Sequence, residues 1–135
     1  MPSSFRSFQP LLAVAWATLP LACFSSFEDV TGLSEPVVEI SATSQNRFQS
    51  ANVTIRVGES VRWRNTGGAF HTVTFDPSRA ADPDNVELPD GVQPFSASLD
   101  AGQSFSRRFT VPGVYRYICE PHEADGMVGT ITVNP

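Results

Sequence analysis

The side chains with the strongest metal-binding chemistry gather near the C-terminus of this 135-residue chain. Cys119, His122 and Met127 fall within nine residues, and His71 precedes the cysteine by 48 positions. Thiolate and imidazole bind copper in both of its oxidation states, whereas a thioether binds it only weakly. Two histidines, one cysteine and a weak axial methionine form the ligand list of blue-copper electron-transfer sites. The spacing therefore predicts a type 1 copper site that holds one ion per chain and alternates between Cu(II) and Cu(I).

Other metal and catalytic chemistries fit these residues less well. Zinc accepts Cys and His, but Met127 is a poor zinc ligand, so Glu123 or Asp125 would have to replace it. A c-type haem requires a C-x-x-C-H motif, which the chain lacks. A nucleophilic Cys–His pair needs an orienting group and an oxyanion site, and the sequence suggests neither.

Four protein ligands leave no open position for a substrate, so we expect an electron carrier and not an enzyme. The alternative function is copper handling, meaning delivery or buffering outside the cytoplasm. A handling protein would more often carry several exposed Met or His residues. A metal-free β-sandwich adhesion module would leave the clustering of the four candidate ligands unexplained.

Short strands, and not helices, must position these ligands. Eleven Pro and nine Gly in a β-branched and Phe-rich background favour strands joined by turns. About seven short strands of this kind indicate an antiparallel β-sandwich. The expected strands cover residues 37–40, 53–57, 61–64, 70–75, 105–111, 114–119 and 127–133.

Two regions carry more detailed expectations. Strands 53–57 and 61–64 flank a Gly58-Glu59 turn, which predicts a hairpin. Residues 76–101 have weak periodicity and predict a long loop, with at most a helical turn. The residues expected to point into the core are Val53, Ile55, Val57, Val61, Trp63, Phe105 and Phe109.

Four segments of the sequence resemble a known family. Residues 115–122 (YRYICEPH) and 126–134 (GMVGTITVN) are similar to the C-terminal segment of plastocyanins and related small cupredoxins. Residues 57–65 (VGESVRWRN) and 70–73 (FHTV) resemble an earlier part of the same proteins. The likeness extends over 37–135, and C-x-P-H-x₄-M before a terminal strand is its most specific motif.

The resemblance implies an all-β, antiparallel Greek-key sandwich or barrel of about seven to eight strands, with copper at one end. His122 would form the partly exposed edge through which electrons pass, inside an apolar docking patch. Pro121 and Gly126 would shape the loop that holds the ligands. The ligands that the resemblance implies are His71, Cys119, His122 and Met127.

Two positions depart from the plastocyanin pattern. Thr72 stands where plastocyanins usually have Asn after the first histidine ligand, so we expect the support of the cysteine loop to differ. Ile118 stands where Tyr commonly precedes the cysteine, so a docking or tunnelling role for that Tyr does not transfer. A general cupredoxin is therefore favoured over one with a photosynthetic partner.

The N-terminal residues predict export. The apolar run 11–22 is too short for a bilayer span of about 20 residues but has the size of a signal-peptide core. Residues 19–23 resemble a bacterial lipobox, which would make Cys23 a lipidated first residue; ordinary cleavage a few residues later is the alternative. We therefore expect a signal peptide at 1–22, a short tether at 23–35 and the copper domain at 36–135, anchored to a membrane by lipid alone.

The charge balance limits the partners. The net charge is −5 and all nine basic residues are Arg, which is unlike a nucleic-acid-binding footprint. We expect a periplasmic or cell-surface monomer with redox proteins as electron donor and acceptor. The acidic residues of the 76–90 region could steer a basic partner or could simply be solvated; they are Asp76, Asp82, Asp84, Glu87 and Asp90.

Overall fold

The computed structural model describes residues 37–135, which form nine strands and three short 3-10 helices. The expected signal peptide at 1–22, Cys23 and the tether at 23–35 lie outside the described residues. Within 37–135 no helix has the length and apolar character needed to cross a membrane. The elements are β1 (Val37–Ala42), β2 (Phe48–Gln49), β3 (Asn52–Arg56), β4 (Ser60–Asn65), β5 (His71–Phe75), η1 (Pro77–Arg79), η2 (Pro83–Asn85), β6 (Phe95–Leu99), β7 (Ser104–Arg108), β8 (Gly113–Ile118), η3 (Glu120–His122) and β9 (Val128–Asn134).

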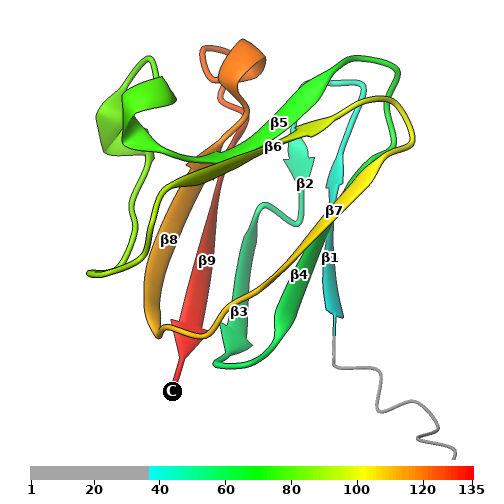
Figure 1. Ribbon diagram of the computed structural model, residues 1–135. Helices are drawn as coiled ribbons and strands as arrows, with labels where there is room; N and C mark the ends of the chain where they lie inside the picture. The colour runs from blue at the N-terminus through cyan, green and yellow to red at the C-terminus, as the bar shows by residue number, and fades with distance from the viewer. Residues whose placement is uncertain (1–36) are drawn as a thin grey trace, which may run out of the picture. The chain divides into compact units, whose positions relative to one another are not determined.

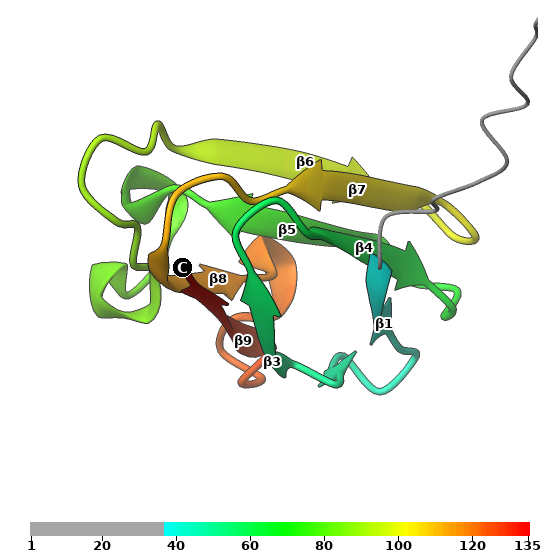
Figure 2. The same cartoon turned by 90° about the horizontal axis from the view of Figure 1, so that it is seen from below.

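The strands form two sheets that face each other, as Figures 1 and 2 show. One sheet has the order β2-β1-β4-β7 and the other has the order β3-β9-β8-β5-β6. The predicted all-β sandwich is therefore confirmed. Both sheets are mixed and not wholly antiparallel, because β1 pairs with β4 and β3 pairs with β9 in parallel. Parallel neighbours cannot be joined by a tight hairpin turn, and in both pairs other strands lie between the two partners in the sequence.

The expected hairpin between β3 and β4 is wrong. β3 pairs with β9, whereas β4 pairs with β1 and β7, so the Gly58 turn carries the chain from one sheet to the other. Gly58 has φ +94, which suits glycine at this corner. Val57 is 41% exposed and does not enter the core, although Ile55 and Val61 do. A two-sheet corner and a hairpin produce the same alternation of apolar and polar residues, so the pattern alone cannot separate them.

The expected long loop at 76–101 is also wrong in part. It contains η1, η2 and the five-residue strand β6, which pairs with β5 from Phe75↔Phe95 to His71↔Leu99. β6 is an edge strand with two serines, and only Leu99 is fully buried, so its hydrophobic pattern is weak. Its neighbour across the gap between the sheets is β7 (Figure 2), where the Arg107 guanidinium lies 3.6 Å from the centre of the Phe95 ring.

The core lies between the two sheets and is rich in aromatic rings. Trp63 is fully buried, as predicted, and Phe109 is 2% exposed. Phe105 is half-buried and stacks on Trp63 with ring centres 5.8 Å apart. Tyr117 meets Trp63 edge-on at 5.5 Å. This packing fixes the positions of β4 and β8 relative to each other, and β8 leads directly to the cysteine.

Candidate metal centre

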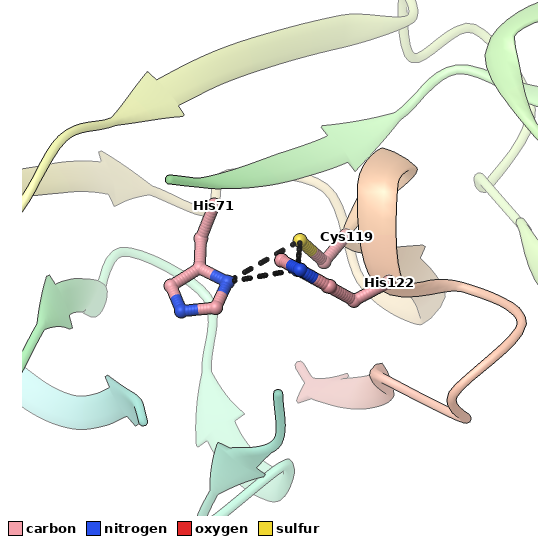
Figure 3. A group of neighbouring side chains, drawn as sticks. All are labelled: His71, Cys119 and His122. Atoms are coloured by element: carbon pink, nitrogen blue, oxygen red, sulfur yellow. Dashed lines mark hydrogen bonds between the residues drawn. The ribbon is translucent and has the colours of Figure 1, made fainter. Parts of the chain in front are cut away.

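Three side chains from two separate segments meet at the end of the sandwich opposite the C-terminus (Figures 1 and 3). His71 begins β5, Cys119 follows β8, and His122 ends η3. The Nδ1 atoms of the two histidines are 3.2 Å apart. Sγ of Cys119 lies 3.7 Å from Nδ1 of His71 and 3.5 Å from Nδ1 of His122. Of the expected ligands, these three present their donor atoms to a common point.

The antiparallel pairing of β5 with β8 explains this convergence. Thr74 faces Ile118 across the pair, so the first residue of β5 and the turn after β8 lie at the same end of the sheet. β8 and β9 are neighbours, and the segment 119–127 joins them. We call this segment the ligand loop.

Backbone hydrogen bonds close the ligand loop on itself. The Cys119 N–H donates to the Met127 carbonyl at 2.9 Å, and the Met127 N–H donates to the His122 carbonyl at 3.1 Å. Gly126 has φ +80, a conformation that glycine adopts without strain, and Pro121 lies in the first turn of η3. The sequence predicted that these two residues shape the loop. Met127 is fully buried beside the end of the loop.

The solvent exposure of the donors is uneven. His71 and Cys119 are fully buried, whereas His122 is half-buried. Burial lowers the pKa of His71, and the nearby His122 lowers it further. Burial also raises the pKa of the Cys119 thiol. A neutral imidazole offers a free lone pair to a metal, and a bound cation reverses the preference of the thiol by stabilising the thiolate.

Thr72 supports the cysteine in two ways. Its N–H donates to Sγ of Cys119 at 3.3 Å, and its hydroxyl oxygen accepts from the Glu120 N–H at 2.8 Å. Thr72 is only 4% exposed, so these bonds are shielded from water. The threonine thereby ties β5 to the ligand loop through its hydroxyl, at the position where the sequence predicted a different kind of support.

Glu120 is the first of two carboxylates in the ligand loop whose roles the sequence did not reveal. It accepts from the Thr74 hydroxyl at 2.6 Å and the Ser96 hydroxyl at 3.1 Å. It also forms an ion pair with Arg79 of η1 at 3.0 Å. Thr72 and Thr74 are both buried on β5, and their hydroxyl groups form a hydrogen bond at 3.2 Å.

Glu123 is the second carboxylate, and it is 7% exposed. It accepts from the backbone N–H groups of Ala81 at 2.7 Å and Asp82 at 3.1 Å, and from the Asn85 side-chain amide at 2.9 Å. Burial alone would raise the pKa of Glu123, but the three hydrogen bonds outweigh it and hold the pKa below its usual value. Because its oxygens face these donors, Glu123 does not suit the role of a replacement zinc ligand.

The remaining acidic residues near the site have local roles. Asp76 and Asp82 accept from backbone N–H groups at the starts of η1 and η2. Glu87 pairs with Arg116 at 3.0 Å. Asp125 accepts from the Asn46 amide at 3.0 Å on the opposite side of the ligand loop. Much of the acidity at 76–90 is thus used to shape the chain.

The donor set fits copper. Two imidazole nitrogens and a buried sulfur face one point, and a buried thioether lies in the same loop, which is the soft combination that copper accepts in both valences. Residues 36–134 match the family described as copper-binding proteins of the plastocyanin/azurin family. The chain belongs to this family.

Individual plastocyanins show the same likeness. A plastocyanin from Scenedesmus fuscus is 40% identical over 86 residues, which cover 64% of this chain and 85% of that protein. A plastocyanin from Nostoc punctiforme is 35% identical over 135 residues, which cover 97% of this chain and 95% of that one. The chain spans only 50–57% of the length of several chloroplastic plastocyanins that it matches.

The fold has solved counterparts. An oxidized amicyanin mutant superposes with a TM-score of 0.58 at 22% identity, covering 77% of this chain and 88% of the amicyanin. At 22% identity this similarity shows that the two proteins share a fold and nothing more. The plastocyanin/azurin assignment and the solved neighbours together confirm the plastocyanin-like cupredoxin that the sequence predicted.

Proposed function

We propose that this cupredoxin is a type 1 copper protein that carries single electrons between redox partners outside the cytoplasm and is not an enzyme. The proposed ligands are His71, Cys119 and His122, with Met127 as a weak axial ligand. The observation that carries the proposal is the approach of two imidazole Nδ1 atoms and one Sγ to within 4.8 Å of one another. One bound copper ion would supply the reversible one-electron chemistry.

The protein's own contribution is a rigid and dry donor set. His71, Cys119 and Met127 are fully buried, so water is kept from the donor atoms. The hydrogen bonds of Thr72 and the closed ligand loop hold the donors in place whichever charge the site carries. A site that does not rearrange favours rapid electron transfer, because little energy is needed to reorganise it.

His122 offers the route to a partner. It is half-buried and has greater solvent exposure than the other proposed ligands. Phe70, which directly precedes His71, is 48% exposed. An exposed ring next to one proposed ligand, together with the half-buried His122, suits a transient apolar contact with a redox protein, and we infer that donor and acceptor dock at this end.

Spectroscopy of a copper-loaded domain tests the proposal. Cu(II) should produce an intense blue band and a narrow copper hyperfine splitting in EPR, both removed reversibly by one electron. The Cys119→Ser variant should lose the band, because the band arises from charge transfer between thiolate and copper. A colourless wild-type protein, or an ordinary tetragonal Cu(II) signal, would instead favour copper delivery or buffering, or zinc.

A second variant tests the axial ligand. Met127→Leu keeps a buried apolar side chain of similar volume but removes the thioether. It should retain copper and shift the reduction potential in voltammetry, since a weak axial ligand tunes the potential. An unchanged potential would show that Met127 is not axial.

Export and anchoring are part of the same proposal. The signal peptide at 1–22 would direct export, a lipid on Cys23 would anchor the protein, and residues 23–35 would tether a monomeric copper domain. Expression of the full chain in a bacterial host with a lipoprotein pathway should place it in the membrane fraction, and Cys23→Ala should release it. A Cys23→Ala protein that stays in the membrane fraction would contradict the lipid anchor.

A further inference from the structure

Two carboxylates of the ligand loop reach the same neighbouring segment. Glu120 and Glu123 lie on either side of Pro121 and His122, and both bind groups between residues 79 and 85. We call residues 76–86, which include η1 and η2, the flanking segment. The half-buried proposed ligand therefore lies between two attachments to the flanking segment.

The two attachments differ in strength. Glu120 meets the flanking segment through Arg79, whose side chain is 50% exposed, so solvent weakens that ion pair. Glu123 is 7% exposed and accepts two backbone N–H bonds and one amide bond. Charged acceptors form the stronger hydrogen bonds, and their strength increases when water is excluded. Glu123 is thus the firmer of the two attachments.

The geometry of the donors calls for a carboxylate. Oε2 of Glu123 accepts from Ala81, while Oε1 accepts from both Asp82 and Asn85. A glutamine has one carbonyl oxygen and one NH₂ group, so one side of the cluster would set a donor against a donor. Glutamine therefore preserves the shape of the side chain, removes its charge and breaks at least one of its three hydrogen bonds.

We propose that Glu123 is a positioning residue for His122: by fixing the ligand loop to the flanking segment, its carboxylate holds the imidazole where a bound copper ion needs it. The inference rests on the proposed copper site. Glu123 directly follows His122, and the η3 turn is only three residues long, so a displacement of one residue moves the other. The other side of the loop is tied at Asp125, whose carboxylate accepts from Asn46 and whose carbonyl accepts from Arg47, but Asp125 and Arg47 are exposed, so solvent weakens these bonds.

The first experiment needs no metal. Amide hydrogen exchange in the metal-free wild-type protein should show protected N–H groups at Ala81 and Asp82, and Glu123→Gln should accelerate the exchange of at least one of them by about tenfold or more. Asn85→Ala, which removes one donor and leaves the carboxylate, should give a smaller acceleration. Asp125→Asn is the matched control, because it removes the same charge from the same loop and should leave both amides protected. Unchanged exchange in Glu123→Gln would overturn the attachment whatever the function of the site.

The second experiment uses the copper-loaded proteins. Glu123→Gln should alter the copper hyperfine splitting and slow electron self-exchange several-fold, because a less fixed imidazole requires more reorganisation. Removal of one negative charge also shifts the reduction potential. Asp125→Asn measures that contribution, because the asparagine oxygen can still accept from Asn46 while the charge is lost. Equal spectra and equal self-exchange rates in the two variants would overturn the positioning role. A wild-type protein without a blue band would overturn the proposed function instead, and the exchange results would still report on the attachment.

Discussion

The aromatic core of this cupredoxin and its ligand end are held together by different forces. The ligand end comprises the ligand loop, β5 and the flanking segment. Rings packed at centre-to-centre distances of 4.9–6.4 Å dominate the core, whereas hydrogen bonds among buried and part-buried polar groups dominate the ligand end. Apolar packing is non-directional and contributes mainly to stability. Hydrogen bonds are directional and fix the orientation of individual side chains. The aromatic core comprises Trp63, Phe75, Phe109, Tyr115 and Tyr117.

This difference predicts that the two regions can be damaged separately. Loss of a ring should lower the free energy of unfolding and leave the copper spectrum of the folded protein unchanged. Loss of a hydrogen bond at the ligand end should cost less stability and change the spectrum. The following variants test this separation.

Phe109→Ala should have the largest effect on stability. The ring is 2% exposed and meets Tyr115 edge-on at 4.9 Å, so truncation leaves a cavity and loses ring contacts. We expect the free energy of unfolding to fall by about 3–5 kcal/mol, measured by denaturant titration. Phe70→Ala, at a 48% exposed ring, is the matched control and should cost far less. An altered copper spectrum in folded Phe109→Ala would show that the core also sets the geometry of the site.

Thr72→Val should lower the free energy of unfolding by less than Phe109→Ala does, but it should change the properties of the bound copper. The valine methyl cannot accept from the Glu120 N–H, so a part-buried donor loses its partner, at a cost of about 1–2 kcal/mol. The Thr72 N–H to Sγ bond involves the backbone and remains available, but the loop that carries the sulfur is less constrained. We expect a shift in the blue band and in the reduction potential. Thr54→Val, at an exposed strand position, provides the comparison, and identical spectra in both variants would remove Thr72 from the support of the site.

The same division explains what the sequence could predict. Cys119 and His122 are recognisable because their types and spacing are local, and the strands are recognisable because alternation is local. The sheet that β3 joins is decided by its pairing with β9, which is distant in the sequence. The pairing of the serine-rich β6 with β5 likewise depends on residues about 20 or more positions apart. The role of Glu123 depends on backbone N–H groups about 40 residues away. Every residue except proline has a backbone N–H, so the residue types at those positions do not reveal which of them will bind Glu123.

Tyr117→Phe tests the boundary between the two regions, because Tyr117 belongs to the core and lies two residues before Cys119. Burial raises the pKa of its hydroxyl, which therefore stays protonated at neutral pH and donates to the Ala51 carbonyl at 3.1 Å. That carbonyl also accepts from the Thr130 N–H at 2.9 Å, so it keeps a partner in the variant. We expect a loss of about 0.5–1.5 kcal/mol in denaturant titration and an unchanged blue band. A shifted band would show that Tyr117 also helps to set the geometry of the copper site.

Glu87→Gln should have the smallest effect and marks the limit of both regions. Its ion pair with Arg116 joins side chains that are 48% and 46% exposed, and the backbone bridge between the same two residues remains. We expect a loss of at most about 1 kcal/mol, which should diminish further when denaturant titration is repeated at high salt. Glu87 directly follows the flanking segment that Glu123 holds. A shifted copper spectrum in this variant would show that a displacement at Glu87 is transmitted along the flanking segment to His122. An unchanged spectrum would show that the attachments of the flanking segment to Glu120 and Glu123 isolate the site from changes at the surface.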